Sequence, residues 1–170
     1  AGGPNENGSF RHVQIYRDNK LFSEFDVYDF ITKGELGASF TLRDNDVIIV
    51  PPVRNRVEIS GPVRREGLFE LKPGETLEDL IQFAGGLGSD AYKERITLSR
   101  KTGKERKVED VDQANFSSFI PQDGDEIRVG MIQNRFANRV QVTGALMRPG
   151  VFALEEGMGI KDLIQKAEGL

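Results

Sequence analysis

The sequence contains no cysteine and no tryptophan, and it has a single histidine, His12. The missing cysteines exclude disulfide bonds, thiolate nucleophiles and thiolate zinc sites. One histidine is too few for an imidazole metal site, and at the start of an expected strand it is more often a surface or hydrogen-bonded residue than a ligand. No GxSxG elbow and no isolated pair of carboxylates stands out either. We therefore expect no enzymatic activity, no metal and no cofactor.

Long apolar runs are also lacking. The longest, Val47–Val50, is far too short to cross a bilayer, and no N-terminal segment has the pattern of a signal peptide. The net charge is −4, from 27 acidic and 23 basic residues, which argues against nucleic acid as a main partner because phosphate binding depends on clustered positive charge. We expect a soluble globular fragment, with membrane association only through parts outside it.

An internal repeat organises the chain. Residues 55–87 and 138–170 share 16 of 33 aligned positions at an offset of 83 residues, and Ala1-Gly2-Gly3 recurs as Ala84-Gly85-Gly86 at the same offset. Solenoid repeats are shorter than this period, so the repeat indicates tandem domains.

Each copy of the repeat begins with alternating apolar residues, at Val57 and Ile59 in the first copy, which predicts a half-buried strand. Glycines bound a hairpin loop, and a second strand follows at Phe69 and Leu71. Four apolar residues then recur at helical spacing, which predicts an amphipathic helix over 77–84 with Thr76 as its cap and Gly85-Gly86 as its end. The equivalents in the second copy are Val140, Val142, Phe152, Leu154, Ile160, Leu163, Ile164 and Ala167, with Gly159 at the cap.

Three further strands are expected after the helix, at Ile96/Leu98, Lys104–Val108 and Glu126–Val129, with a turn at Lys101-Thr102-Gly103. Two strands, a helix and three strands in about 80 residues is the β-grasp order, an α+β fold with a helix packed across a mixed sheet. Residues 10–50 repeat its last three strands, at Val13/Ile15, Leu21–Phe25 and Val47–Val50. We therefore expect residues 1–52 to be the C-terminal half of one β-grasp repeat, 53–133 a whole repeat, and 134–170 the N-terminal half of another.

Two acidic turns and a glycine string invite functional interpretations that ordinary structure explains better. Asp44-Asn45-Asp46 and Asp123-Gly124-Asp125 could suggest calcium, but the remaining ligands of a calcium loop are absent and such residues before a strand are usual in turns. Gly85-Gly86-Leu87-Gly88 follows a helix, whereas a dinucleotide loop precedes one, so a helix end is favoured.

Arginines near the first strand and the hairpin loop are the candidate ligand-binding residues. Their guanidinium groups could pair with uronate carboxylates of an acidic polymer or with acidic residues of a neighbouring subunit. Solvated arginines beside Glu58 or Glu66 are the simpler alternative. The sugar-stacking aromatics that a tight saccharide site needs are few, because Phe69 and Phe152 are expected in the core. The candidate residues are Arg56, Arg64, Arg65, Arg139 and Arg148.

The string V-x-I-S-G-x-V-x-x-x-G-x-F-x-L-x-x-G-E-T-L-x-D-L-I-x-x-A-G-G-L over residues 57–87 resembles the soluble-ligand-binding β-grasp family, known as SLBB. Residues 140–170 resemble it again, with Pro149-Gly150 in place of Glu66-Gly67. The closing segments QDGDEIRV and LRDNDVIIV are similar to the last strand of that family. The resemblance is to the SLBB domains of bacterial polysaccharide export proteins, although modules of cobalamin-carrier and respiratory-complex proteins share the family name.

The resemblance implies a periplasmic part of an outer-membrane-associated capsule or exopolysaccharide exporter. In such proteins SLBB modules assemble around a ring-shaped homo-oligomer through which the polysaccharide passes. We therefore expect a non-catalytic scaffold that assembles with like modules. The alternative is a stand-alone β-grasp module that binds a soluble saccharide or another small ligand, which would saturate with ligand instead of self-associating.

Overall fold

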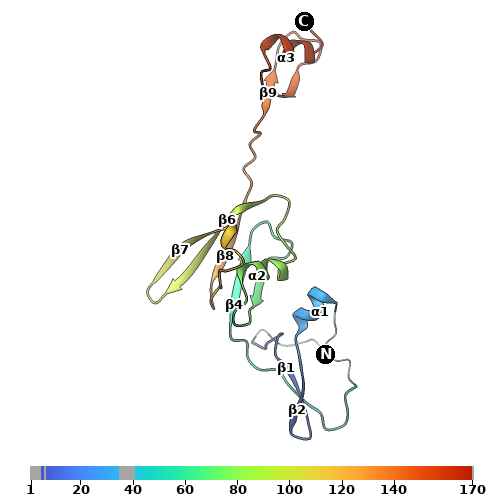
Figure 1. Ribbon diagram of the computed structural model, residues 1–170, viewed down its shortest axis with the longest axis vertical. Coiled ribbons are helices and arrows are strands. Elements are labelled where there is room, and N and C mark those ends of the chain that lie inside the picture. The colour runs from blue at the N-terminus through green and yellow to red at the C-terminus, as the bar shows by residue number, and fades with distance from the viewer. Residues whose placement is uncertain (1–4, 6, 35–40, 170) are drawn as a thin grey trace. The chain divides into compact units, whose positions relative to one another are not determined.

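The computed structural model describes residue 5 and residues 7–34 and 41–169 (Figure 1). The chain forms two compact units, Ala1–Ile132 and Gln133–Leu170. Ala1-Gly2-Gly3, which the repeat aligns with a helix end, lies outside the described residues.

A five-stranded mixed sheet forms the larger part of the first unit. Its strands lie in the order β5-β4-β8-β6-β7, so the first and last strands of this repeat, β4 and β8, are neighbours. They run parallel with Ile59 opposite Ile127, and every other neighbouring pair in this sheet is antiparallel. The turn between β6 and β7 is Gly103-Lys104. It begins two residues later than the predicted turn, which started at Lys101. The strands are β4 Arg56–Ser60, β5 Gly67–Glu70, β6 Ala91–Thr102, β7 Glu105–Asp112 and β8 Glu126–Met131.

Helix α2, Leu77–Phe83, begins and ends as its sequence predicts. The Thr76 hydroxyl accepts a hydrogen bond from the Asp79 amide, and the Asp79 carboxylate accepts one from the Thr76 amide at 2.8 Å. This reciprocal pair satisfies two amides that a helix start leaves without partners. Gly85 and Gly86 follow with φ of 80° and 96°, a left-handed conformation that ends the helix.

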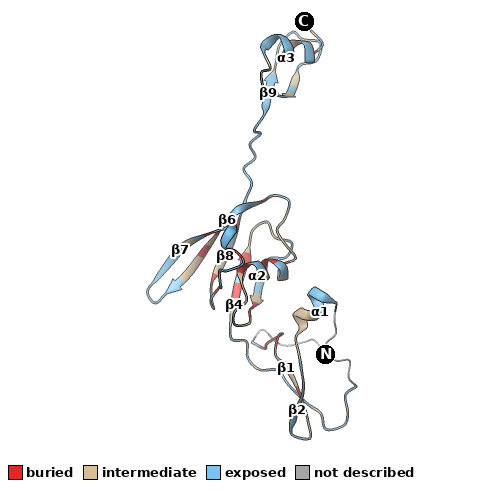
Figure 2. Ribbon diagram, viewed as in Figure 1, coloured by how far each residue is buried: buried red, intermediate tan, exposed pale blue. Residues whose placement is uncertain are grey.

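One hydrophobic core lies between α2 and the five-stranded sheet (Figure 2). The four apolar residues predicted on the inner face of the helix are all buried there, and Leu80 is completely inaccessible to solvent. The sheet contributes the alternate residues of its strands, as a one-sided sheet requires. The buried cluster comprises Val57, Ile59, Leu71, Leu77, Leu80, Ile81, Ala84, Ala91, Ile96, Leu98, Val111, Phe116, Ile127 and Val129.

A separate three-stranded sheet, in the order β2-β1-β3, precedes the five-stranded one. It repeats the order β7-β6-β8 of the middle repeat, with Ile15 opposite Ile48 as Leu98 is opposite Ile127. Helix α1 and the single 3-10 turn η1 follow the second strand of their respective sheets, and neither was predicted. The elements are β1 Val13–Arg17, β2 Lys20–Phe25, α1 Val27–Lys33, β3 Val47–Ile49 and η1 Gln113–Asn115.

The second unit contains the hairpin β9 Arg139–Val142 and β10 Gly150–Ala153, followed by helix α3 Ile160–Lys166. Val140 pairs with Phe152 as Val57 pairs with Phe69, so the repeat extends to strand register. The Gly159 amide donates to the Asp162 carboxylate at 2.8 Å, which is half of the arrangement at Thr76.

The α+β fold with a mixed sheet and one helix across it is confirmed. The division into repeats 1–52, 53–133 and 134–170 stays a prediction.

Candidate functional site

The hairpin loop of the middle repeat lies along the end of α2. The Arg64 amide donates to the Gly86 carbonyl at 3.1 Å, and the Arg65 amide donates to the Ala84 carbonyl at 2.9 Å. These bonds use carbonyl groups that a helix end leaves without partners, and they place two cations at the negative end of the helix dipole. The loop backbone is therefore fixed while both arginine side chains are exposed.

At Gly61 the backbone turns out of strand β4 and into this loop. The φ of Gly61 is 98°, and a Cβ atom there would lie 2.2 Å from the carbonyl oxygen of Val129 on β8. The Gly61 amide donates to the Glu66 carboxylate at 2.7 Å, so Glu66 closes the loop on itself. The position of Arg64 and Arg65 thus depends on a glycine that no other residue type fits.

The candidate arginines of the middle repeat do not form one cluster. Arg56 lies at the start of β4, opposite Glu70, while Arg64 and Arg65 follow the other end of that strand. The Arg56 amide donates to the Asp123 carboxylate at 2.8 Å. Arg56 also lines a hollow of about 400 Å³, together with Phe10, Tyr28, Leu68 and Glu70. The candidate arginines of the middle repeat therefore occupy two separate positions, one at each end of β4.

The candidate arginines of the second unit also lie at two separate positions, one at the start of the first strand and one in the hairpin loop. Arg139 begins β9 and its guanidinium lies 5.3 Å from the Phe136 ring centre. Arg148 repeats the backbone bond of Arg65, because its amide donates to the Ala167 carbonyl at 3.1 Å. Its Nε atom pairs with Glu168 at 2.9 Å, a carboxylate that stands where the middle repeat has Gly85. Within the described residues, the Arg65 side chain has no such acidic partner.

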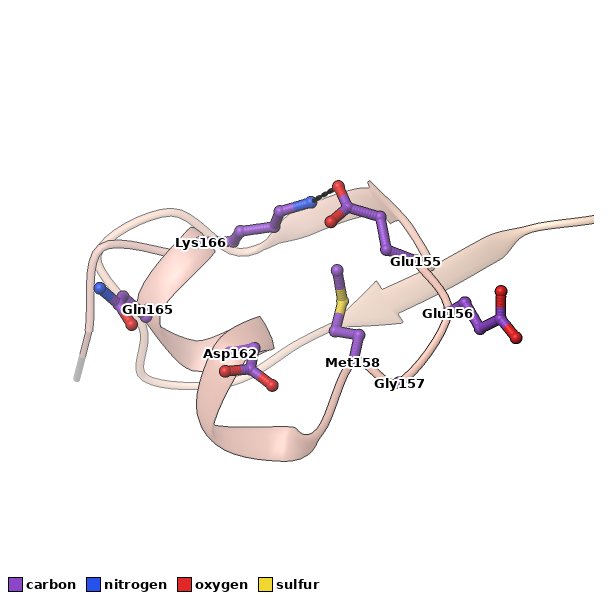
Figure 3. A pocket seen from close by; sticks show the side chains of 7 residues that line it. All are labelled: Glu155, Glu156, Gly157, Met158, Asp162, Gln165 and Lys166. Atoms are coloured by element: carbon purple, nitrogen blue, oxygen red, sulfur yellow. Dashed lines mark hydrogen bonds and ion pairs between the residues drawn. The ribbon is translucent and has the colours of Figure 1, made fainter.

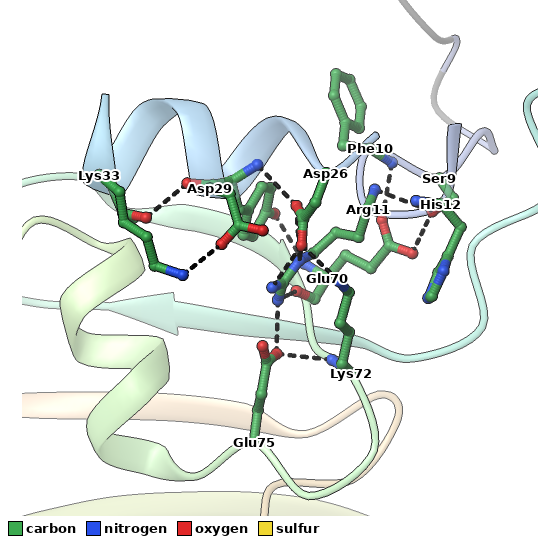
Figure 4. A network of polar contacts seen from close by, with 12 residues as sticks. Ser9, Phe10, Arg11, His12, Asp26, Asp29, Lys33, Glu70, Lys72 and Glu75 are labelled. Carbon is green, nitrogen blue, oxygen red and sulfur yellow. Dashed lines mark hydrogen bonds and ion pairs between the residues drawn. The ribbon is translucent and has the colours of Figure 1, made fainter. Parts of the chain in front are cut away.

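A buried polar network joins the three-stranded sheet to the middle repeat (Figure 4). The Arg11 side chain, 4% exposed, lies 3.0 Å from Asp26 and 2.6 Å from Glu75. It also donates to the Glu70 carbonyl at 3.3 Å and lies over the rings of Tyr28 and Phe83, 4.6 and 4.8 Å from their centres. One arginine therefore joins the segment before β1, helix α1 and the segment around α2 through charge, hydrogen bonds and aromatic contacts.

The carboxylates of Asp26 and Glu70 make the remaining contacts of this network. Asp26 caps α1 by accepting from the Tyr28 amide, and it pairs with Lys72 at 2.6 Å. Burial alone would raise the pKa of Asp26, but hydrogen bonds from Arg11 and Lys72 outweigh it and hold the pKa below its ordinary value. The Glu70 carboxylate accepts from the Ser9 hydroxyl at 2.6 Å and from the Phe10 amide at 2.9 Å. These groups hold one another in place, which suits a structural joint and not proton transfer.

This network was not predicted from the sequence. Arg11 and Glu75 are 64 residues apart, so no local spacing predicts their contact. The one local signal was Asp26, which follows a strand and precedes a short helix as a capping residue does. His12, expected to be a surface or hydrogen-bonded residue, contacts Glu24 of the adjacent strand at 2.8 Å.

In each of the two acidic turns, an arginine side chain binds an aspartate. Arg17 binds Asp46 through Nε at 2.8 Å and Nη2 at 2.7 Å, and Arg100 binds Asp125 through the same two atoms at the same distances. Such two-point pairs use the carboxylate oxygens that a cation would need. Across residues 5, 7–34 and 41–169, no group of three His, Cys, Asp or Glu residues is placed to hold a metal ion.

The second unit has a hollow of about 480 Å³ beside α3 (Figure 3). Glu155 and Lys166 pair across its edge at 2.5 Å, and Met158 projects between them. Its remaining lining is Glu156, Gly157, Asp162 and Gln165. In the part of the chain that the structure describes, no helix is long and apolar enough to span a membrane.

Comparison with known families agrees with this repeated architecture. The SLBB domain model matches residues 56–111, from β4 almost to the end of β7, and residues 139–170, which contain the hairpin and helix of the second unit. The two segments make up more than half of the chain, and the chain belongs to the SLBB domain family.

Its curated relatives include two Escherichia coli proteins, both described as polysialic acid transport protein KpsD. Each is 26% identical to this chain over 168 residues. The alignment covers 98% of this chain and 29% of each relative, so the chain spans less than a third of their length.

Proposed function

We propose that this chain is a non-catalytic scaffold of tandem SLBB modules within a periplasmic, outer-membrane-associated polysaccharide export protein. The modules assemble with like modules into a homo-oligomer around the path of an extracellular polysaccharide. The observation that carries the proposal is the Arg11 network, in which a buried cation joins one repeat to the next. A joint of this kind holds neighbouring modules in a fixed relation, as a scaffold requires.

The similarity to polysialic acid transport proteins supports export as the process that this scaffold serves. The exposed arginines of the hairpin loops suit that setting, because guanidinium groups bind carboxylates weakly and reversibly when both are hydrated. Weak contacts of this kind would let an acidic polymer pass without being retained.

A bacterial cell that produces the protein provides the test. Removing residues 53–133 from its gene should leave the polysaccharide chemically unchanged but retained inside the cell. The measurement is polymer at the cell surface and within the periplasm, with Lys161→Ala at an exposed position as the control. Altered polymer composition or chain length, with secretion intact, would contradict the scaffold and indicate an enzyme.

The second candidate is a module that binds a soluble saccharide. The hollow that Phe10 and Arg56 line favours it, since it brings an aromatic ring and an arginine to the edge of one cavity. Calorimetric titration of the chain with acidic oligosaccharides separates the two. A scaffold should show no saturation up to millimolar ligand, whereas saturable binding lost in Arg56→Ala would support the ligand module.

A further inference from the structure

The sheet of the middle repeat has a hollow on its outer face, which is the side opposite α2. Successive residues of a strand point to opposite faces, so the neighbours of the buried core residues lie on this side. Four adjacent strands form the hollow, β4, β8, β6 and β7, and its volume is about 260 Å³. Its lining consists of Glu58, Ser60, Thr97, Ser99, Val108, Glu126, Ile127 and Arg128. Apart from Val108 and Ile127, all of these residues have a hydroxyl or charged side chain.

Strand register arranges these side chains in two rows that cross the strands. The first row runs from β4 to β7 through Glu58, Glu126, Ser99 and Val108. The second row runs from β4 to β6 through Ser60, Arg128 and Thr97. Neighbouring strands lie about 4.8 Å apart, so polar groups recur along each row at a short and regular interval. Such rows suit an elongated ligand that repeats its own polar groups.

Two charged side chains in this hollow have no partner among the residues that the structure describes. Neither an ion pair nor a side-chain hydrogen bond holds Glu58 or Arg128 there, and both residues are exposed. Their neighbours are paired, because Glu126 binds Arg106 at 2.6 Å and the Thr97 hydroxyl donates to Asp110 at 2.9 Å. The hollow therefore offers one carboxylate and one guanidinium group to a ligand.

The corresponding face of the three-stranded sheet is apolar. In strand register, Val47 and Ile49 occupy the positions of Glu126 and Arg128. The polar hollow is thus a property of the middle repeat and not of the repeated fold. Its charges also fit poorly into a protein interface, because the buried centre of such an interface is depleted in charged residues. A hydrated ligand suits this face better than a second protein surface.

The groups that line the hollow define the chemistry of this ligand. A guanidinium group such as that of Arg128 binds carboxylates through charge-assisted hydrogen bonds. The Glu58 carboxylate accepts hydrogen bonds, and the Ser99 hydroxyl both donates and accepts them, so together they suit ligand hydroxyl groups. Val108 is 66% exposed at the end of the first row and offers an apolar contact to the C–H face of a sugar ring. A saccharide that contains carboxylates has all three kinds of group.

We infer that the outer face of the middle repeat binds an acidic polysaccharide, with Arg128 on a sugar carboxylate and Glu58 on sugar hydroxyl groups. The inference rests on the proposed function, because it assigns the surface that the exported polymer contacts. Each contact is weak, since the groups of the site are hydrated before the ligand arrives. A short oligosaccharide therefore does not saturate the site at millimolar concentration, whereas a long polymer rebinds through its many equivalent units.

Native electrophoresis through gels that contain alginate, a polymer of uronic acids, tests this inference. Alginate should retard the chain relative to a gel without polymer, whereas dextran, a neutral polysaccharide, should not. Arg128→Ala should reduce the retardation at least threefold, while the matched control Lys161→Ala, which removes an exposed positive charge from α3, should keep it. Glu58→Ala is the sharpest variant, because it removes a negative charge and would strengthen a purely ionic attraction to alginate. We expect it to reduce the retardation at least twofold.

Absent retardation by alginate, equal loss in Lys161→Ala or increased retardation of Glu58→Ala would overturn the inference. As a second measurement on the unsubstituted chain, alginate oligosaccharides should shift amide resonances of β4, β6 and β8 in proportion to their concentration. Shifts confined to the hairpin loop at residues 61–66, or to the surroundings of Phe10, would also overturn it. Failure of this inference would leave the export test above unaffected, whereas intact secretion after removal of residues 53–133 would contradict the proposed function even if alginate binds.

Discussion

The middle repeat and the second unit contain equivalent hairpins and helices, yet the helix of the middle repeat is buried much more completely. Leu80 of α2 is completely inaccessible to solvent, while Leu163 at the same position of α3 is half-buried. Both helices nevertheless span seven residues and begin at equivalent positions. Local sequence is thus sufficient for the elements, whereas burial depends on whether the last three strands of a repeat lie beneath them.

Substituting the equivalent leucines should give the largest difference between the two repeats. Leu80→Ala removes side-chain volume from a filled core and should cost about 2–5 kcal/mol of unfolding free energy. Leu163→Ala should cost less than about 1.5 kcal/mol, because its side chain is only half removed from water. The measurement is denaturant unfolding of dilute protein followed by circular dichroism. Equal losses would mean that α3 already has a covered face.

The second-largest difference is expected for the glycines that end the first strand of each hairpin, in the stability that their replacement by alanine costs. Gly61 and Gly144 have φ of 98° and 120°, so alanine is strained at both. At Gly61 the new methyl group would also meet the Val129 carbonyl, whereas at Gly144 nothing lies within 4 Å. Gly61→Ala should therefore cost about 2 kcal/mol more than Gly144→Ala.

Thermal unfolding of the two glycine variants beside the parent protein measures this difference. A Gly61→Ala protein as stable as Gly144→Ala would mean that β4 and β8 move apart at little cost. The parallel pairing that closes the middle repeat would then be weaker than its geometry indicates.

Sequence alone was sufficient for most of this fold. Helix α2 with its Thr76 cap and the strands of all three repeats follow from apolar spacing and turn residues, which act over a few positions. Helix α1 was not predicted, although Val27, Phe30 and Ile31 recur at helical spacing, because this stripe extends over only five residues and has no second turn to support it. Its ends at Asp26 and Gly34 are the only strong signals.

The candidate site was harder to predict than the fold. Strand β4 begins at Arg56 and ends at Ser60, before Arg64 and Arg65, so arginines that are close in sequence lie at opposite ends of a strand. The Arg11 network joins residues some 60 positions apart in sequence, and its contacts arise only when two repeats pack. Local spacing carries no information about such a joint.

The smallest expected effect is a pH dependence of stability at the first acidic turn. Arg17 and the Arg43 amide bind Asp46 and lower its pKa to about 2, below an unfolded value of about 3.9. A carboxylate with a lowered folded pKa adds stability that is present above pH 4 and lost as the pH falls toward 2. Asp46→Asn should therefore flatten the pH dependence of unfolding between pH 4 and 2, most clearly in hydrogen exchange of β1 and β3 amides. Asn in place of Asp46 keeps the size of the side chain, so a loss of stability that is equal at all pH values would show that Asp46 acts through hydrogen bonds and not through its charge.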